Sequence, residues 1–308
     1  MTALLTRSDV RRVLDVPAVL EALRAGFLQS SEIEPLRIRT DLPGPGTATA
    51  LLPGVIPGIP AYTVKVNAKF PGATPALRGV VCLHDLTDGT LLAVLDSSTI
   101  TAWRTGLAAA IATDALAPAG TVGVIGTGAQ AAMALAGLVA LRPVDRLVLH
   151  DVVPERASEF LARQGIPGVV VSSPRDVAAA AEVVVLATWS REPLLTAADV
   201  RPGSHLTTLG ADEPGKVELS ADLLAGARVI VDDRALAARM GALGNVGLSA
   251  DTAHATLTEV LTGAIVGRRS ADDVTVYAPV GLPWQDLAIA WPVYQASKGN
   301  SRTIDFLG

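Results

Sequence analysis

The sequence of 308 residues is poor in cysteine, aromatic residues and charge: it has one cysteine, 4% aromatic residues and 18% charged residues. A single cysteine, Cys82, excludes a disulfide within the chain. Because Cys82 stands in the apolar run GVVCLHD, we expect a buried strand residue and not a nucleophile. The net charge is −5, so a large basic surface is missing as well. Nucleic acid is therefore not an expected partner.

Long hydrophobic runs are also absent, because the longest apolar stretches are alanine-rich and interrupted, as Asp114 interrupts LAAAIATDALA. None approaches the 20 or so apolar residues that cross a membrane. The N-terminus MTALLTRSDVRR places its charges after a short apolar patch, the reverse of a secretory signal. We expect a soluble, cytoplasmic protein without a membrane partner.

Histidine is scarce too, and its four copies lack the spacing of metal ligands, so we expect no metal site. They are His84, His150, His205 and His254.

The pattern of apolar residues changes along the chain. Residues 1–118 begin with a helix that Asp15 can cap and continue with strand-like segments, of which two are joined by LTDG, a hairpin signal. From Thr121 onward short apolar strands alternate with helices, which is typical of a parallel sheet. A last helix, LPWQDLAIAWPVYQAS, contains Pro292, which we expect to kink it or end its regular part.

These patterns predict an α/β protein: a Rossmann-type doubly wound parallel sheet plus an α+β domain built from both chain ends. We expect the α+β domain to comprise residues 1–118 and 285–308, and the Rossmann domain to comprise residues 119–284.

A glycine-rich turn, TVGVIGTGAQA, carries the first functional signal. Gly126, Gly128 and Ala131 form G-x-G-x-x-A directly between a predicted strand and a predicted helix. Such a turn lets the backbone approach a pyrophosphate and directs helix N-terminal amides at it. We therefore expect this turn to bind a dinucleotide through its five residues Gly126, Thr127, Gly128, Ala129 and Gln130.

An acid follows at the expected distance. Asp151 ends the next strand, LVLHD, 23 residues beyond Gly128, where a carboxylate accepts hydrogen bonds from the adenosine ribose. Because a carboxylate repels a 2′-phosphate, we expect NAD to be preferred over NADP. An alternative role for Asp151 is to cap the helix that begins near VPERA. Thr188, after the strand EVVVLAT, is expected to border the cofactor as well.

Four segments in this order resemble the ornithine cyclodeaminase and mu-crystallin family: WRTGLAAAIATDALAP with VGVIGTGAQA, LGADEPGKVELSADLL, and VTVYAPVGLPWQDLA. The resemblance covers nearly the whole chain. It implies a homodimer with a substrate-binding and dimerisation domain beside the Rossmann domain. It also implies a nicotinamide-dependent reaction at the carbon–nitrogen bond of an α-amino or α-imino acid.

The resemblance assigns Arg37, Lys65 and Arg104 to the substrate carboxylate and the reacting carbon. Arginine binds carboxylates bidentately, and a partly desolvated lysine can exchange protons with an imine. Arg39 is an alternative to Arg37, and Lys69 is an alternative to Lys65, although Lys65 keeps the family's spacing to the following proline.

The same resemblance implies that the loop LGADEPG approaches the nicotinamide side, with Gly210, Ala211 and Asp212 lining the cleft. In that loop Lys216 and Glu218 could equally form a surface ion pair. Val280 of APVG is expected to bind the cofactor as well.

One position departs from the family pattern. The cyclodeaminases have an aspartate in D-S-x-G, and the reductase and alanine dehydrogenase branches often have lysine, whereas this chain has Ala278 followed by Pro279. Alanine transfers no proton. Lys65, Asp212 or His84 could substitute, the substrate could differ, or catalysis could be lost.

We therefore expect an NAD-dependent imine reductase or amino-acid dehydrogenase. A cyclodeaminase that uses NAD catalytically is the first alternative, and a non-catalytic NAD(P)H-dependent binding protein is the second.

Overall fold

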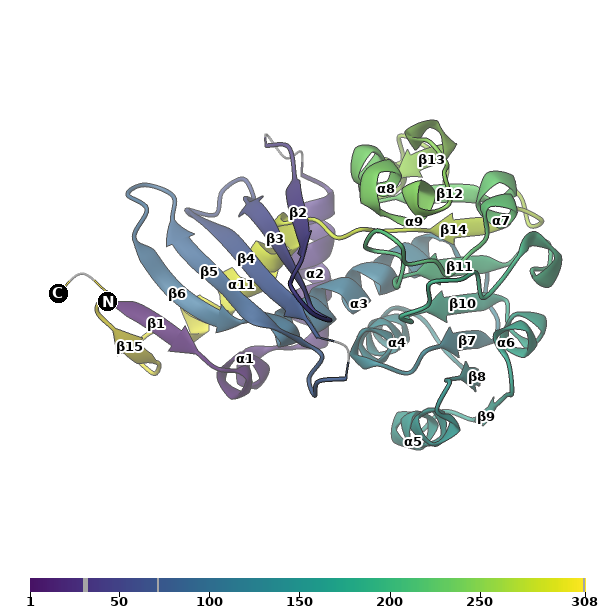
Figure 1. Cartoon of the computed structure of the whole chain (residues 1–308), viewed down its shortest axis with the longest axis horizontal. Helices are drawn as coiled ribbons and strands as arrows, with labels where there is room; N and C mark the ends of the chain where they lie inside the picture. Colours follow the sequence, from purple (N-terminus) through teal and green to yellow (C-terminus); the bar gives the residue numbers. More distant parts are fainter. Residues whose placement is uncertain (30–32, 71, 307) are drawn as a thin grey trace. The chain divides into compact units, whose positions relative to one another are not determined.

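The computed structural model describes residues 1–29, 33–70, 72–306 and 308, and it divides into two compact units (Figure 1). Unit 1 comprises Met1–Arg104 and Leu282–Gly308, and unit 2 comprises Thr105–Gly281. The division falls inside helix α3 (Ser97–Leu116), whereas the sequence pattern changes after residue 118.

Unit 1 is built on a sheet that has seven strands in the described part of the chain, in the order β15-β1-β6-β5-β4-β3-β2. Its strands are β1 (Thr2–Leu5), β2 (Leu36–Asp41), β3 (Thr47–Gly54), β4 (Ala61–Lys69), β5 (Leu77–Asp85), β6 (Leu91–Asp96) and β15 (Arg302–Ile304). Its helices are α1 (Arg7–Val13), α2 (Val16–Phe27), the start of α3, and α11 (Trp284–Ser297). Strands β1 and β6 pair in parallel, and the other neighbours pair antiparallel.

Helix α11 packs on β3, β4, β5 and α2, and Figure 1 shows it in yellow across the sheet. The Asp15 carboxylate caps α2, as expected, by accepting a 3.1 Å hydrogen bond from the Ala18 amide. The Phe27 and Trp284 rings meet edge to face at 4.9 Å, and Gly26 leaves room for that indole. Pro292 lies inside α11 without ending it.

The two faces of this sheet differ in burial because side chains alternate along each strand. Arg37 and Lys65 belong to one rung of paired residues and are buried on the face that α11 covers. The next rung, which includes Ile38, Val66 and Val80, is exposed on the opposite face.

Unit 2 is a parallel sheet of eight strands within the described residues, in the order β13-β12-β14-β11-β10-β7-β8-β9. Its strands are β7 (Val122–Ile125), β8 (Leu147–His150), β9 (Gly168–Val170), β10 (Val183–Leu186), β11 (His205–Thr208), β12 (Arg228–Val231), β13 (Ala253–Thr256) and β14 (Thr275–Tyr277). The connecting helices are α4 (Ala129–Leu141), α5 (Pro154–Gln164), α6 (Pro174–Ala180), α7 (Ala221–Gly226), α8 (Arg234–Met240), α9 (Ala242–Asn245) and α10 (Leu257–Leu261). Two short 3-10 turns are η1 (Ala197–Asp199) and η2 (Ala250–Thr252).

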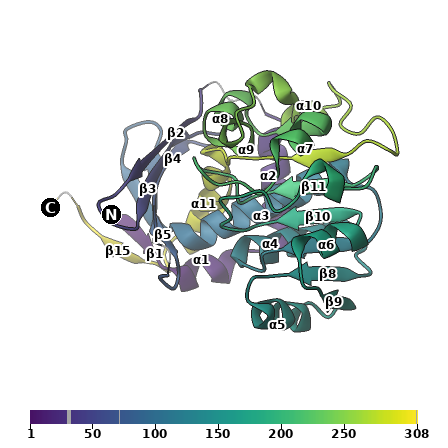
Figure 2. The same ribbon diagram turned by 45° about the vertical axis from the view of Figure 1, so that its right-hand side comes forward.

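The central strands β7 and β10 are buried along their whole length, which explains their continuous apolar sequences VGVI and VVVL. The chain runs from β7 outward through β8 and β9, and then returns to β10 on the other side of β7 (Figure 1). Figure 2 shows β8, β9 and β10 from a second direction. This reversal confirms the predicted doubly wound, Rossmann-type sheet. Ligands of such sheets bind at the carboxyl edge beside the reversal, here between β7 and β10.

Among the described residues no helix is long and apolar enough to cross a membrane.

Candidate functional site

Unit 1 contains a buried ionic cluster around Asp286, which lies in the first turn of α11. Its Oδ1 atom lies 2.8 Å from Lys65 Nζ of β4 and 3.1 Å from Arg104 Nε of α3. All three side chains are at most 5% exposed. Two cations therefore share one carboxylate oxygen in a region shielded from water, and their positive charge exceeds the negative charge of Asp286.

The environment lowers the pKa of Lys65 from 10.5 to about 7. Burial is the main cause, and the positive charges of Arg104 and Arg37 add to it, whereas Asp286 opposes it. A lysine in this state carries its proton only part of the time near neutral pH, which suits a proton donor and acceptor.

The three cations that the sequence singled out thus lie close together. Arg37 is buried on β2, which β3 separates from β4, and it belongs to the same rung as Lys65, with Leu51 of β3 between them. The alternatives lie further along the same face of the sheet: Arg39, on the rung of Asn67, forms a bidentate ion pair with Asp41, and Lys69 ends β4 on the outermost rung.

Sequence reasoning missed Asp286, Gln285, Thr101 and Asn67. Gln285 accepts a 2.9 Å hydrogen bond from Arg104, while Thr101 Oγ1 is approached by Lys65 at 3.4 Å and by Asn67 at 3.3 Å. One signal was available for Asp286, namely an acid in the otherwise apolar helical segment LPWQDLAIA, which predicts a buried charge that needs a partner.

Unit 2 presents the glycine turn at the carboxyl end of β7. Gly126 has a φ of +85°, and a Cβ there would lie 2.8 Å from the Ala187 carbonyl oxygen, so this position requires glycine. A Cβ at Gly128 would meet open space.

Helix α4 starts directly after Gly128, with Ala129 and Gln130 in its first turn, and no described side chain caps it. Uncapped amides and open space fit the pyrophosphate of a dinucleotide.

Asp151, directly after β8, ties the turn to the neighbouring strand. Its Oδ2 accepts hydrogen bonds from the amide and hydroxyl of Thr127 at 2.8 and 2.9 Å, and its Oδ1 accepts one from the Val153 amide at 3.0 Å. Partial burial raises the pKa of Asp151, but these hydrogen bonds outweigh burial and leave the pKa below its usual value. The carboxylate is half-buried and ionised, and it keeps a lone pair for a ribose hydroxyl.

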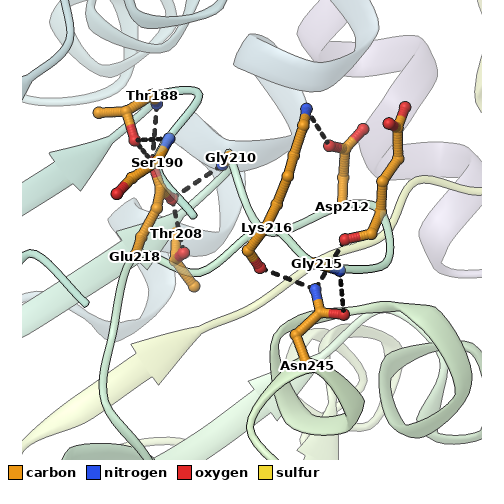
Figure 3. A network of polar contacts seen from close by, with 10 residues as sticks. Thr188, Ser190, Thr208, Gly210, Asp212, Gly215, Lys216, Glu218 and Asn245 are labelled. Atoms are coloured by element: carbon orange, nitrogen blue, oxygen red, sulfur yellow. Dashed lines mark hydrogen bonds and ion pairs between the residues drawn. The ribbon is translucent and has the colours of Figure 1, made fainter. Parts of the chain in front are cut away.

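The loops after β10 and β11 are joined by Glu218, which Figure 3 shows between them. The sequence allowed a surface ion pair between Lys216 and Glu218, which is wrong. Glu218 is fully buried and bonds Thr188, Thr208 and Gly210, whereas Lys216 pairs with Asp212 at 3.2 Å.

Two other residues that the sequence assigned to the cofactor site, Ala211 and Val280, are both buried. The Val280 amide donates hydrogen bonds to the carboxylate of Asp232, directly after β12.

Ala278 is fully buried just after β14, where its amide donates to the Ile230 carbonyl. Of the suggested substitutes, His84 stacks on Tyr62 across the sheet face opposite Lys65, so it is not part of the cluster. Asp212 belongs to unit 2 and is paired with Lys216.

No group of described His, Cys, Asp or Glu residues has the arrangement of a metal site. His205 lies between Thr275 and Thr207 within the sheet, and burial lowers its pKa to about 3.

The reversed parallel sheet and its glycine turn define a Rossmann-type protein with an additional α+β unit. The chain belongs to the ornithine cyclodeaminase/mu-crystallin family, which matches residues 1–301 and confirms the resemblance.

Individual relatives have related names. The alanine dehydrogenase of Archaeoglobus fulgidus is 34% identical over 229 residues, which cover 72% of this chain and 71% of the relative. The Delta(1)-pyrroline-2-carboxylate reductase of Bacillus cereus is 26% identical and covers 98% of this chain and 99% of its own length. An archaeal alanine dehydrogenase dimer solved with bound NAD superposes with a TM-score of 0.89 at 28% identity, over 99% of both chains.

Proposed function

We propose that this protein is an NAD(H)-dependent oxidoreductase that acts on the carbon–nitrogen bond of an α-amino acid or its imine. The observation that carries the proposal is the buried cluster in which Lys65 and Arg104 share Asp286. Its excess positive charge suits the carboxylate of an amino or imino acid. Its lysine, with a pKa of about 7, suits proton exchange at the substrate nitrogen.

Within this proposal Arg37 and Arg104 bind the substrate carboxylate. Gln285 orients the Arg104 guanidinium through a 2.9 Å hydrogen bond, and Asp286 holds Lys65 in place at 2.8 Å. Lys65 donates a proton to the nitrogen when an imine is reduced and accepts it in the reverse direction. Fixed groups of this kind lower the barrier mainly by positioning and charge stabilisation.

The dinucleotide would be held by the turn Gly126–Gln130, Asp151, Thr188, Gly210, Ala211 and Val280. NAD(H) supplies hydride transfer when bound. The ionised Asp151 carboxylate favours NAD over NADP, since a 2′-phosphate at this position would meet a negative charge.

The assembly that fits this reading is a cytoplasmic homodimer. The exposed face of the unit 1 sheet carries Ile38, Val66 and Val80, which are 50%, 48% and 39% exposed and lie in one rung. A second copy of this chain would cover such an apolar strip. The archaeal alanine dehydrogenase with bound NAD, whose fold this chain shares, is a dimer.

The test is an assay of NADH absorbance with product mass spectrometry, run on cyclic imines, on 2-oxo acids with amines, and on linear diamino acids. We expect steady NADH oxidation with an imine, or with a 2-oxo acid and an amine. Lys65→Met should abolish turnover and leave NADH affinity nearly unchanged, whereas the matched Lys69→Met should retain turnover.

Two outcomes would replace the proposal. Loss of ammonia from a diamino acid without net NADH change would indicate a cyclodeaminase, despite Ala278. Tight NADH binding without turnover on any substrate would indicate a binding protein.

A further inference from the structure

A buried carboxylate of unit 2 has no role in the reaction proposed above. We propose that Glu218 is a positioning residue that fixes the loops after β10 and β11, and thereby shapes the nicotinamide side of the dinucleotide site. This inference rests on the proposed function, because it assumes that a dinucleotide binds at the carboxyl edge of the sheet.

Glu218 forms hydrogen bonds through both of its carboxylate oxygens. Its Oε1 accepts from the amide and the hydroxyl of Thr188 at 2.7 and 2.8 Å, and its Oε2 accepts from Thr208 Oγ1 at 2.7 Å and the Gly210 amide at 2.8 Å. Figure 3 shows these contacts converging on one side chain from two neighbouring loops. Each carboxyl oxygen therefore holds a different loop, and the two loops cannot move apart without breaking these buried hydrogen bonds.

The packing around Glu218 leaves little freedom. The side chain is 0% exposed, and a Cβ at Gly210 would lie 2.4 Å from Glu218 Oε1 and from the Thr188 carbonyl oxygen. The absence of a side chain at Gly210 thus lets the two loops approach closely.

The segment that leads to Glu218 is held from its other side by Asn245, at the end of α9. Asn245 Nδ2 donates to the Glu213 and Lys216 carbonyls, both at 2.8 Å, and its Oδ1 accepts from the Gly215 amide at 3.2 Å. Asn245 therefore holds the segment before Glu218, and the Glu218 carboxylate holds Glu218 itself (Figure 3).

The loops that Glu218 fixes lie beside the expected dinucleotide site. Thr188 follows β10, and a Cβ at Gly126 would lie 2.9 Å from Thr188 Cγ2, so the loop held by Glu218 borders the glycine turn at the sheet reversal. The turn and Asp151 lie toward β8 and suit the adenosine half and the pyrophosphate. The nicotinamide half then extends toward β10 and β11, where Glu218 fixes the backbone.

The experiment compares two ligands of the full-length protein. NADH and ADP-ribose share the adenosine and the pyrophosphate, but only NADH has the nicotinamide, so the ratio of their dissociation constants reports on the nicotinamide side. Both are titrated into wild type, Glu218→Gln and Glu182→Gln by calorimetry. Glu182 is a control carboxylate at the amino ends of the strands of the same sheet, where it is partly exposed, accepts the Thr121 amide at 2.9 Å and pairs with Arg201 at 3.2 Å.

Glutamine at position 218 turns one oxygen into a donor that faces other donors. We expect NADH binding to weaken by about tenfold relative to ADP-ribose, the effect of one net hydrogen bond. Glu182→Gln should leave the ratio unchanged. If Glu218→Gln does not fold, Thr208→Val removes one hydrogen bond and should move the ratio in the same direction by a smaller factor.

An unchanged ratio in a folded Glu218→Gln, or in Thr208→Val where the first variant does not fold, would overturn the inference. Failure of the wild type to bind either ligand would instead overturn the proposed function, and with it the premise of this inference.

Discussion

The environment of Lys65 determines the charge of an amine in the protein interior. Burial and two neighbouring arginines favour the neutral amine, and Asp286 favours the ammonium, so the pKa settles at about 7. The folded protein binds fewer protons at Lys65 than the unfolded chain does between pH 7 and 10.5. Lys65 therefore destabilises the fold below pH 7, and this penalty disappears as the pH rises toward 10.5.

Asp286→Asn removes the charge that raises the pKa of Lys65, so this pKa should fall further. The limb of the kcat/KM profile near pH 7 should move to lower pH, as measured with the substrate identified in the NADH assay. The free energy of unfolding should also fall by about 3–5 kcal/mol, because two buried cations lose their partner.

Gln285→Met is the control for this prediction, because it removes the hydrogen bond to Arg104 without changing charge. The limb of the kcat/KM profile of this variant should stay at the same pH as in the wild type. A limb that stays in place in Asp286→Asn as well would mean that Asp286 does not tune Lys65.

The sequence predicted the cations of this cluster but not its carboxylate, Asp286. Arg37, Lys65 and Arg104 were predicted through a resemblance and stay predictions as site residues. Asp286 lies 221 residues from Lys65, so their contact depends on how α11 packs on β4, which no local pattern records.

At the scale of elements, the turn between β7 and α4 is held in place by a residue that follows the neighbouring strand β8. Asp151, directly after β8, accepts hydrogen bonds from both the amide and the hydroxyl of Thr127. The same carboxylate therefore holds the turn and is available to select the cofactor, two roles that a sequence motif does not separate.

Asp151→Ser tests the second role. Serine removes the negative charge, so discrimination against NADPH should relax. The ratio of kcat/KM for NADH to kcat/KM for NADPH should fall by about tenfold or more, which corresponds to a charge contribution of about 1.4 kcal/mol or more. Steady-state kinetics with NADH and NADPH give the ratio. Glu155→Ser, a change of the same charge in the first turn of α5, should leave the preference unaltered. An unchanged ratio in Asp151→Ser would remove the reason for assigning NAD.

The elements themselves were predicted best where their patterns were long or carried a distinctive turn. The cap of α2, the hairpin between β5 and β6 and the strands β7 and β10 are of this kind. The strands β14 and β15 span three residues each, too few for a periodic pattern. Their pairing depends on distant partners, such as β1 for β15.

At the scale of the whole molecule, the proposed homodimer makes the apolar strip on unit 1 testable. Val66→Lys places a charge in the centre of the strip and should convert dimers to monomers in size-exclusion chromatography with light scattering. Val139→Lys alters an equally exposed valine on α4 and should leave the dimer intact, since Val139 is 47% exposed and Val66 is 48% exposed. A monomeric wild type, or a dimeric Val66→Lys, would exclude this interface.

The pairing of β1 with β15, in which Thr2 faces Ile304, has a consequence for synthesis on the ribosome. Unit 2 is one continuous stretch of chain and can fold once it has emerged from the ribosome, whereas unit 1 also needs residues Leu282–Gly308, which emerge afterwards. Until then Lys65 of β4 and Arg104 of α3 lack Asp286, the carboxylate with which they form ion pairs. The emerging chain can thus complete the parallel sheet of unit 2 before the ionic cluster of unit 1 is able to form.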